Sequence, residues 1–133
     1  MNDLLPKDYA KQRAAFRLPM LASDPVHLLF SIDGVNVDPL LDELGAGGGR
    51  FVAVRAYDKM YKGQVLGPAV LLLPDIGMPV VYPIVRWMSY PRIGVQFEES
   101  SEKNKEMIFR FMFYVERKMV QMQKAATAED RLR

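Results

Sequence analysis

The chain has 133 residues, which is enough for one domain whose hydrophobic core needs no metal or disulfide support. Half of the residues are hydrophobic and 26% are charged, a balance typical of globular proteins. The net charge of +2 is too small to indicate nonspecific binding to nucleic acid, and the absence of cysteine excludes disulfides, thiolate metal sites and cysteine nucleophiles.

The N-terminal residues 1–25 show no sustained periodicity, and three prolines interrupt any long helix. We interpret them as a flexible arm with one short helical turn around residues 8–16. The first eight residues lack the basic and apolar regions of a signal peptide. The most apolar run, residues 69–74, is too short to span a bilayer. We therefore expect a cytoplasmic protein.

The arm carries two arginines, Arg13 and Arg17, four residues apart. Side chains at this spacing project from the same side of the backbone, so both guanidinium groups can close on one ligand. A guanidinium suits a phosphate or the edge of a guanine, and it also stacks on a purine. The alternative is that both arginines are only solvated surface charges.

Six short segments with strand periodicity follow the arm, at residues 26–32, 35–41, 50–57, 64–73, 78–88 and 92–97. Tight turns are predicted at Asp33-Gly34, at residues 74–77 and at Tyr90-Pro91. Pro83 implies an edge position or a bulge in the fifth strand. This pattern predicts a mainly β protein built on a six-stranded antiparallel barrel.

A long C-terminal helix is predicted at residues 102–123, after Ser100 and Ser101, either of which can cap it. One face carries hydrophobic residues at helical spacing: Ile108, Met112, Val115, Met119 and Met122. Phe109 and Phe113 lie off this stripe. Packing on the barrel explains the stripe, and the alternative for part of the helix surface is contact with a partner protein or a second copy of the chain. We expect the tail, residues 124–133, to fray.

The segment 42–49 contains four glycines and leads into a strand. We interpret it as a loop that needs positive φ angles or close approach by another group. It is not a Walker phosphate-binding loop, because Arg50 and Phe51 stand where that motif has a lysine and a hydroxyl. The dinucleotide-binding fingerprint fails as well, since its last glycine is missing and no helix follows.

The arginine pair, the acidic-x-small-x-x-Gly segment after it, the short strands and the closing helix together resemble the PilZ family of bacterial cyclic di-GMP receptors. The resemblance covers residues 11–123. It implies a PilZ-like barrel plus helix for residues 26–123, with cyclic di-GMP as ligand and no further cofactor. It also implies an output through an unidentified protein partner in motility, adhesion, biofilm or exopolysaccharide production.

The second PilZ motif has an Asp or Asn, a small hydroxyl residue and a glycine. Aligned on the Gly-Gly-x-Arg that often follows it, these roles fall on Glu43, Gly45 and Gly48. A frame that starts at Asp42 keeps the aspartate but puts the bulky Leu44 at the small position, so we favour the first frame. The carboxylate would accept hydrogen bonds from N1 and N2 of guanine.

Three further residues are candidates for the site. Trp87 lies near the end of the fifth predicted strand, where some PilZ proteins stack on guanine, although a core position is the alternative. Arg50 could add charge for a phosphate, and Lys11 could assist the arginine pair.

We expect no enzymatic activity and no metal site. The chain has one histidine and no cysteine, and no residue spacing is typical of metal ligands or of a nucleophile with its base. The alternative to a receptor is a PilZ-like adaptor that does not bind cyclic di-GMP and acts through protein contacts. The degenerate second motif and the broad apolar surface of the helix favour that adaptor.

Overall fold

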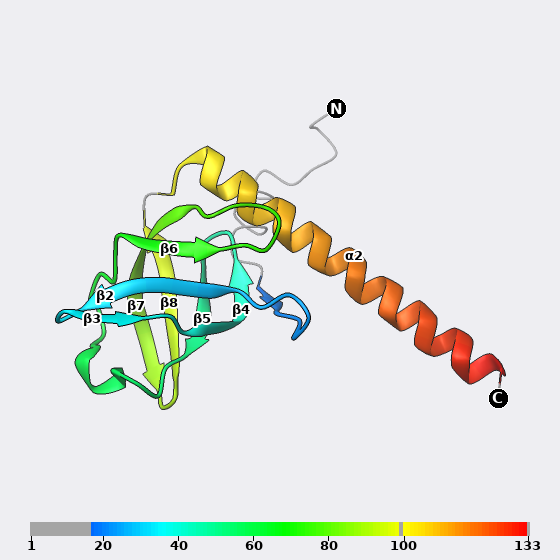
Figure 1. Cartoon of the computed structure of the whole chain (residues 1–133), viewed down its shortest axis with the longest axis horizontal. Helices are drawn as coiled ribbons and strands as arrows, with labels where there is room; N and C mark the ends of the chain where they lie inside the picture. Colours follow the sequence, from blue (N-terminus) through cyan, green and yellow to red (C-terminus); the bar gives the residue numbers. More distant parts are fainter. Residues whose placement is uncertain (1–16, 99, 133) are drawn as a thin grey trace.

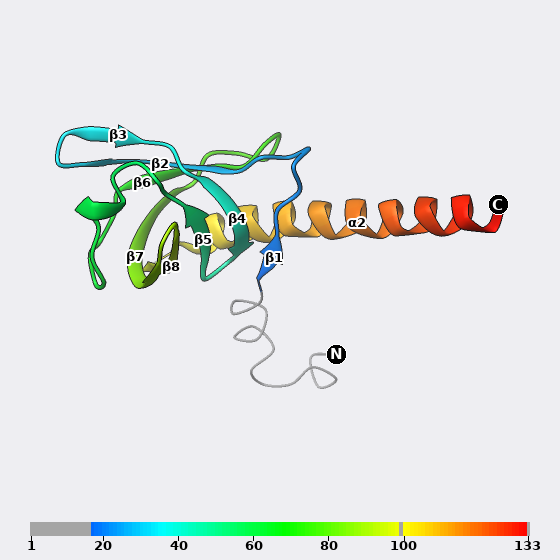
Figure 2. The ribbon, with the colours of Figure 1, turned by 90° about the horizontal axis from the view of Figure 1, so that it is seen from below.

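The computed structural model describes residues 17–98 and 100–132, and the side chains up to residue 128. These residues form a β-barrel and one long α-helix (Figures 1 and 2). The elements are β1 (Leu18–Pro19), β2 (His27–Ile32), β3 (Val35–Val37), β4 (Leu40–Gly45), β5 (Gly48–Val52), the short 3₁₀ helix η2 (Tyr57–Lys59), β6 (Ala69–Leu72), β7 (Val80–Ser89), β8 (Arg92–Glu98) and α2 (Glu102–Leu132).

Six of the strands close into a barrel. The strand order is β1-β4-β5-β8-β7-β6-β2-β3, and an additional pairing joins β2 to β4 at His27 and Leu40. The strands from β4 through β2 therefore form a closed ring in which every pairing is antiparallel. The remaining two, β1 and β3, extend it at β4 and β2. The predicted six-stranded antiparallel barrel with a C-terminal helix is confirmed.

One hydrophobic core fills the barrel and continues to α2. Strand residues such as Phe51 and Ile93 are fully buried, and one face of α2 buries Ile108, Phe111 and Val115 in the same cluster. Full burial of a side chain of this size contributes about 1.5–3 kcal/mol. The first half of α2 is therefore a structural part of the domain, whereas the second half extends beyond the barrel (Figure 2).

The helix begins as predicted and ends later than predicted. Ser101 caps it, because its Oγ accepts a hydrogen bond from the Asn104 amide at 3.1 Å. Residues 124–132 are helical rather than frayed. They contain several alanines and no proline or glycine, and the Thr127 hydroxyl donates to the Gln123 carbonyl at 2.9 Å. Across the described residues, no helix combines the length and apolar character needed to cross a membrane.

Several predicted strand bounds were wrong. The predicted strand 35–41 is two strands, β3 and β4, separated by Asp38-Pro39. The strand predicted to end at residue 57 ends at Val52, and Ala56 further along has a φ of 65°, which a strand does not allow. The strand predicted to begin at residue 64 begins at Ala69, because Gly67-Pro68 interrupts it and proline lacks the amide that a ladder needs.

The glycine segment 42–49 was predicted to be a loop and is a strand hairpin instead. Its residues lie in β4 and β5, joined by a two-residue turn at Ala46-Gly47. The predicted close approach is confirmed, since a Cβ on Gly49 would lie 2.7 Å from the Glu43 carbonyl oxygen. By contrast, the turn predicted at Asp33-Gly34 is confirmed, with φ angles of 48° and 75°.

An ion pair attaches the segment before β2 to α2. The buried Asp24 carboxylate accepts hydrogen bonds from Lys118 Nζ at 2.8 Å, Ser23 Oγ at 3.0 Å and Tyr114 Oη at 3.3 Å. The hydrogen bond from Lys118 holds the pKa of Asp24 below its usual value, although burial opposes this, and the bonds from Ser23 and Tyr114 add to the lowering. The segment that follows β1 is therefore held against the helix.

We predict that Asp24→Asn destabilises the protein by about 1 kcal/mol at neutral pH, the usual net value of such a hydrogen bond. Because the folded-state pKa of Asp24 is lowered, its charge stabilises the fold fully above the unfolded-state pKa of about 4. That stabilisation is lost as the pH falls through the lowered folded-state value. The difference in melting temperature between the two proteins should therefore shrink on acidification. Exposed Asp38→Asn is the control, and an equal loss of stability in both variants would contradict the prediction.

Candidate functional site

A pocket of about 490 Å³ lies on the outside of the barrel, next to Arg17, the residue before β1. Its lining comes from that residue, from the hairpin of β4 and β5, and from β7 and β8: Arg17, Glu43, Gly47, Gly49, Arg50, Arg86, Trp87, Gly94, Val95 and Gln96. The volume lies within the range of sites that bind small molecules and cofactors.

Arg17 lines this pocket, and one of its guanidinium nitrogens has no hydrogen-bond partner among the described residues. Pairing of β1 with β4, at Leu18 and Leu44, fixes the backbone next to it. Its Nη1 atom is buried, and among the described residues it has no hydrogen-bond partner. Burial lowers the pKa of Arg17, and the charge of Glu43 partly offsets this effect. A buried donor without a partner costs about 1–3 kcal/mol, so an acceptor from a ligand would stabilise it.

Gly48 makes room for that guanidinium. A Cβ at this position would collide with the carbonyl oxygen of Val95 and would lie 2.8 Å from Arg17 Nη2. Gly48 pairs with Gly45 at the end of the hairpin and with Gln96 on β8. A larger residue would therefore disturb both the strand pairing and the position of Arg17.

A bulge in β4 decides which carboxylate faces the pocket. The register shifts between Leu41 and Glu43, so two adjacent side chains, Asp42 and Glu43, are partly exposed between the buried Leu41 and Leu44. Such a bulge re-aims side chains without breaking the inward alternation on either side. Glu43 lines the pocket, whereas Leu44 is fully buried in the core.

The two carboxylates are held differently. Asp42 accepts hydrogen bonds from Arg50 Nε at 2.8 Å and from Arg92 Nε at 3.1 Å, so both of its oxygens have an arginine partner. Burial alone would raise the pKa of Asp42, but these two arginines more than offset that effect and lower it. The hydrogen bond to Asp42 also raises the pKa of Arg50. Glu43 lies 3.7 Å from Arg50 Nη1, a looser contact that leaves its carboxylate available to a ligand.

A second bulge shapes the opposite wall. The register of β7 against β8 shifts between Val85 and Trp87, and both Arg86 and Trp87 are exposed as a result. The Trp87 indole lies over Gly94, where any Cβ would overlap the ring, and 44% of the residue remains exposed. Arg86 Nε donates to Gln96 Oε1 at 2.8 Å. This wall therefore offers a flat aromatic surface beside a positioned guanidinium.

The structure brings together four of the residues chosen from the sequence, since Arg17, Glu43, Arg50 and Trp87 all line this pocket. Gly48 lies directly beside Arg17, whereas Gly45 pairs with Gly48 and does not line the pocket. The other two candidates, Lys11 and Arg13, lie outside the described residues.

Among the lining residues that sequence reasoning missed, two have polar side chains, Arg86 and Gln96. Gln96 stands between the buried Val95 and Phe97, so strand alternation already indicates that it faces outward. Arg86 gave a weaker signal, because Arg86 and Trp87 both face outward only through the bulge in β7. Among the described residues, no cluster of histidine, aspartate and glutamate could hold a metal ion.

The chemistry of the pocket suits an anionic ligand with a planar group. Guanidinium groups from several strands can donate to phosphate oxygens, and the indole can stack on an aromatic base. The Glu43 carboxylate can accept hydrogen bonds from ring nitrogens.

Comparison with known proteins identifies the fold through structure. No protein-family profile matches the sequence, and no curated protein sequence matches it either. The PilZ domain of YcgR from Escherichia coli, solved with c-di-GMP, superposes with a TM-score of 0.71 at 17% identity, covering 82% of this chain and 95% of that domain. The K. pneumonia MrkH complex with c-di-GMP gives a TM-score of 0.70 at 14% identity, over 80% of this chain and 53% of MrkH. The Bacillus subtilis inhibitor of motility, MotI, gives 0.56 at 12% identity, over 79% of this chain and 50% of MotI.

This chain spans about half the length of MrkH, of MotI and of intact YcgR, and nearly the whole of the isolated YcgR PilZ domain. The match therefore concerns one domain of those longer proteins. The similarity in sequence is low throughout, so it is the arrangement of strands and helix that carries the comparison. The fold of this chain is that of a PilZ domain.

Proposed function

We propose that this protein is a cyclic di-GMP receptor that binds the nucleotide without catalysis and passes the signal to a protein partner. The observation that carries the proposal is Arg17, which lines a pocket of ligand size and whose buried Nη1 has no hydrogen-bond partner among the described residues. The presence of c-di-GMP in the structures of MrkH and of the YcgR PilZ domain supports this choice of ligand.

In the proposed complex, each wall of the pocket has a separate task. Arg17, with Arg13 four residues earlier in the sequence, clamps guanine and phosphate, and Lys11 adds charge. Glu43 accepts from N1 and N2 of a guanine, and backbone at Gly45 and Gly48 closes the hairpin side. The remaining wall residues divide the rest of the ligand: Trp87 stacks on the base, and Arg50 contributes charge to a phosphate.

The free energies of the expected contacts favour binding despite the degenerate second motif. Glycine at position 45 in place of a hydroxyl residue removes one hydrogen bond, a loss of about 1 kcal/mol. A bidentate arginine contact is worth about 1–3 kcal/mol, so two arginines outweigh that loss. The affinity should therefore be reduced relative to an intact motif rather than abolished.

Ligand binding would change the surface by drawing the residues before Arg17 against the barrel, since β1 already holds Arg17 there. The change can be no larger than the difference in ligand affinity between the two arrangements. By this proposal the protein acts in the cytoplasm, and its output is motility, adhesion, biofilm formation or exopolysaccharide production.

The alternative is an adaptor that does not bind cyclic di-GMP. One observation favours it: Phe113 on α2 is 56% exposed, and an aromatic side chain so exposed is typical of a protein interface. A second copy of the chain is one candidate for the partner at this helix.

Arg17→Ala should weaken cyclic di-GMP binding at least about tenfold without unfolding the protein, because it removes one bidentate contact. Calorimetric titration of the purified protein measures this, with GTP as the ligand control. Arg13→Ala should behave in the same way, whereas Arg110→Ala, on the far side of the helix, should bind like the unaltered protein. Unchanged affinity in Arg17→Ala would show that the clamp is misassigned.

Substitutions of Glu43 and Asp42 should have different effects on ligand affinity and on melting temperature. Glu43→Gln should lower the affinity for cyclic di-GMP by about tenfold and leave the melting temperature nearly unchanged, since its contact with Arg50 is loose. Asp42→Asn should lower the melting temperature, because it weakens two arginine hydrogen bonds. The reverse pattern, with affinity lost only in Asp42→Asn, would favour the frame that starts at Asp42.

Gly94→Ala should displace the Trp87 ring, because no Cβ fits beneath it. Trp87 is the only tryptophan, so its fluorescence emission reports the displacement directly as a shift to longer wavelength. The affinity for cyclic di-GMP should fall in the same variant, since the stacking surface has moved. Gly77→Ala, which meets only the flexible side chain of Met107, is the control. An unshifted emission spectrum would contradict the geometry of this wall.

A further inference from the structure

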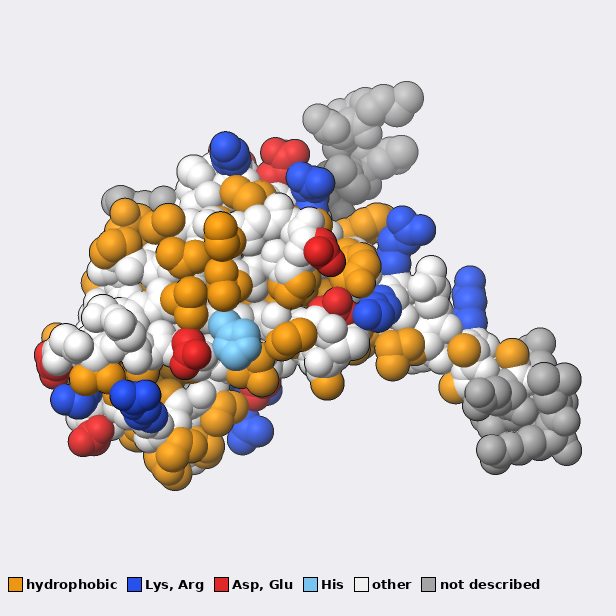
Figure 3. All heavy atoms as spheres, in the orientation of Figure 1, with side chains coloured by type: hydrophobic (Ala, Val, Ile, Leu, Met, Phe, Trp, Pro, Cys, Tyr) orange, Lys and Arg blue, Asp and Glu red, His pale blue; other side chains and the backbone are white. Residues whose placement is uncertain are grey.

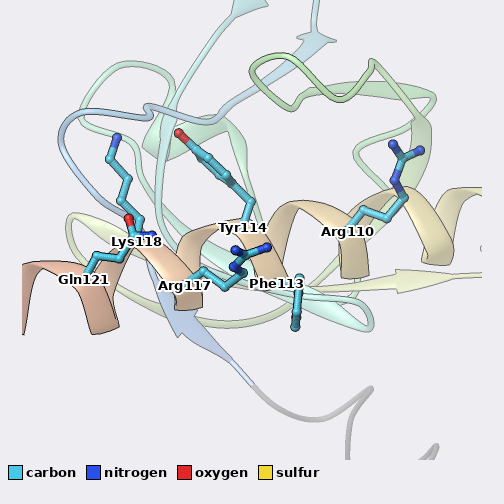
Figure 4. A pocket seen from close by; sticks show the side chains of 6 residues that line it. All are labelled: Arg110, Phe113, Tyr114, Arg117, Lys118 and Gln121. Carbon is cyan, nitrogen blue, oxygen red and sulfur yellow. The ribbon is translucent and has the colours of Figure 1, made fainter.

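A second surface lies on α2, away from the nucleotide pocket. It is formed by six residues of the helix at spacings of three and one: Arg110, Phe113, Tyr114, Arg117, Lys118 and Gln121. They surround a hollow of about 420 Å³ (Figure 4). Helical spacing puts Phe113 and Arg117 on the side of α2 opposite buried residues such as Ile108. Tyr114 and Lys118 lie at the flank of the helix, where both bond Asp24. We call these six residues the basic aromatic face.

The aromatic side chains of this face are unusually exposed. Phe113 is 56% exposed and Tyr114 is 43% exposed. The Arg117 guanidinium carbon lies 5.8 Å from the Phe113 ring centroid, so the cation rests against the ring. Both hydrophobic and basic side chains are exposed on the part of the helix beyond the barrel (Figure 3). An aromatic and arginine pair in such a position is typical of the residues that dominate binding energy at interfaces.

Of the three cations on this face, only Lys118 forms an ion pair among the described residues. Lys118 is paired with Asp24 at 2.8 Å. Neither Arg110 nor Arg117 forms an ion pair with a carboxylate of the described residues. Two guanidinium groups therefore flank exposed aromatic rings, and neither has an acidic partner in the described part of the chain. A complementary surface would carry carboxylates and at least one hydrophobic side chain.

We propose that the basic aromatic face binds an acidic segment of a partner protein that carries aromatic or aliphatic side chains. Carboxylates of the segment bind Arg110 and Arg117, and a hydrophobic side chain fills the hollow against Phe113 and Tyr114. Arginine suits this role because its planar fork binds a carboxylate through two parallel hydrogen bonds. The hydrophobic contact excludes water around those bonds and strengthens them.

A peptide explains this surface better than a polyanion. Binding to nucleic acid gains affinity from the number of phosphates that are neutralised, and only two cations of the face are uncommitted. Attraction to an anionic membrane likewise grows with each additional lysine or arginine. The chain as a whole has a net charge of only +2. A surface with few cations and two exposed rings instead favours a short segment that matches both.

The face borders the segment that leads to the nucleotide pocket. Tyr114 and Lys118 point toward the chain before β2 (Figure 4), and both hold Asp24 in that chain. The same chain leads back through β1 to Arg17. A partner on this face would therefore touch the segment that the ligand arginine anchors. The docking itself does not depend on nucleotide binding, and its test is done without nucleotide.

The test is fluorescence anisotropy with the full chain and a labelled peptide in which aspartate and glutamate alternate with leucine and phenylalanine. The double variant Arg110→Glu/Arg117→Glu should bind this peptide at least about tenfold more weakly. Lys62→Glu/Lys103→Glu, at two exposed lysines outside the face, changes the net charge equally and should leave the affinity unchanged. Phe113→Ser should also weaken binding, because the hydrophobic contact is lost.

A peptide with lysine in place of its acidic residues provides the reciprocal measurement. It should bind the Arg110→Glu/Arg117→Glu variant better than the unaltered protein, which would also show that the variant is folded. An equal loss of affinity for the acidic peptide in both double variants would mean that only the net charge of the protein matters, and it would overturn the proposal. Binding of phosphatidylglycerol vesicles or of single-stranded RNA, lost in Arg110→Glu/Arg117→Glu but without any peptide binding, would overturn it as well.

Discussion

The structure depends on the closure of six short strands into one ring, which leaves little room inside and allows little irregularity. Every strand from β4 through β2 pairs on both sides, so inward positions must be hydrophobic and close contacts must be glycine. Gly49 shows the constraint directly, since a Cβ there would lie 2.7 Å from the Glu43 carbonyl oxygen. A chain under this constraint can vary only on its outer surface and at bulges, and both walls of the pocket are built there.

Two bulges on different strands do the same structural work. In β4 and in β7, one extra residue places two adjacent side chains outside while the neighbours on either side remain in the core. One bulge exposes Asp42 and Glu43, and the other exposes Arg86 and Trp87. Glu43 from the first bulge and the arginine–tryptophan pair from the second thus line one pocket with Arg17, whose Nη1 is buried without a described partner. Burial lowers the pKa of that arginine, a cost that an anionic ligand would offset.

The helix connects this site to the rest of the surface. Its first half completes the core through Ile108, Phe111 and Val115, so the barrel alone would expose a large hydrophobic area. One flank of the helix holds Asp24 through Lys118 and Tyr114, and thereby the chain that follows β1. The proposed nucleotide site and the proposed docking face share that chain. A receptor of this design would need no large rearrangement, because a change in the position of the segment reaches both surfaces.

The sequence by itself determined the class of fold, the turn at Asp33-Gly34, a serine cap for the helix and the first three positions of its buried stripe, Ile108, Met112 and Val115. The stripe was wrong at Met122, which is 56% exposed, and it left out the fully buried Phe111. These features follow from local periodicity, turn chemistry and capping, which neighbouring residues set. It also singled out Arg17, Glu43, Arg50 and Trp87, which share one pocket. Only the tertiary structure decided that 42–49 is a hairpin, that Asp42 is engaged by Arg50 and Arg92, and that Arg86 and Gln96 join the site. Those outcomes depend on the register between strands that are distant in the chain. A bulge adds one residue to a strand, and every following side chain of that strand then points to the opposite face of the sheet.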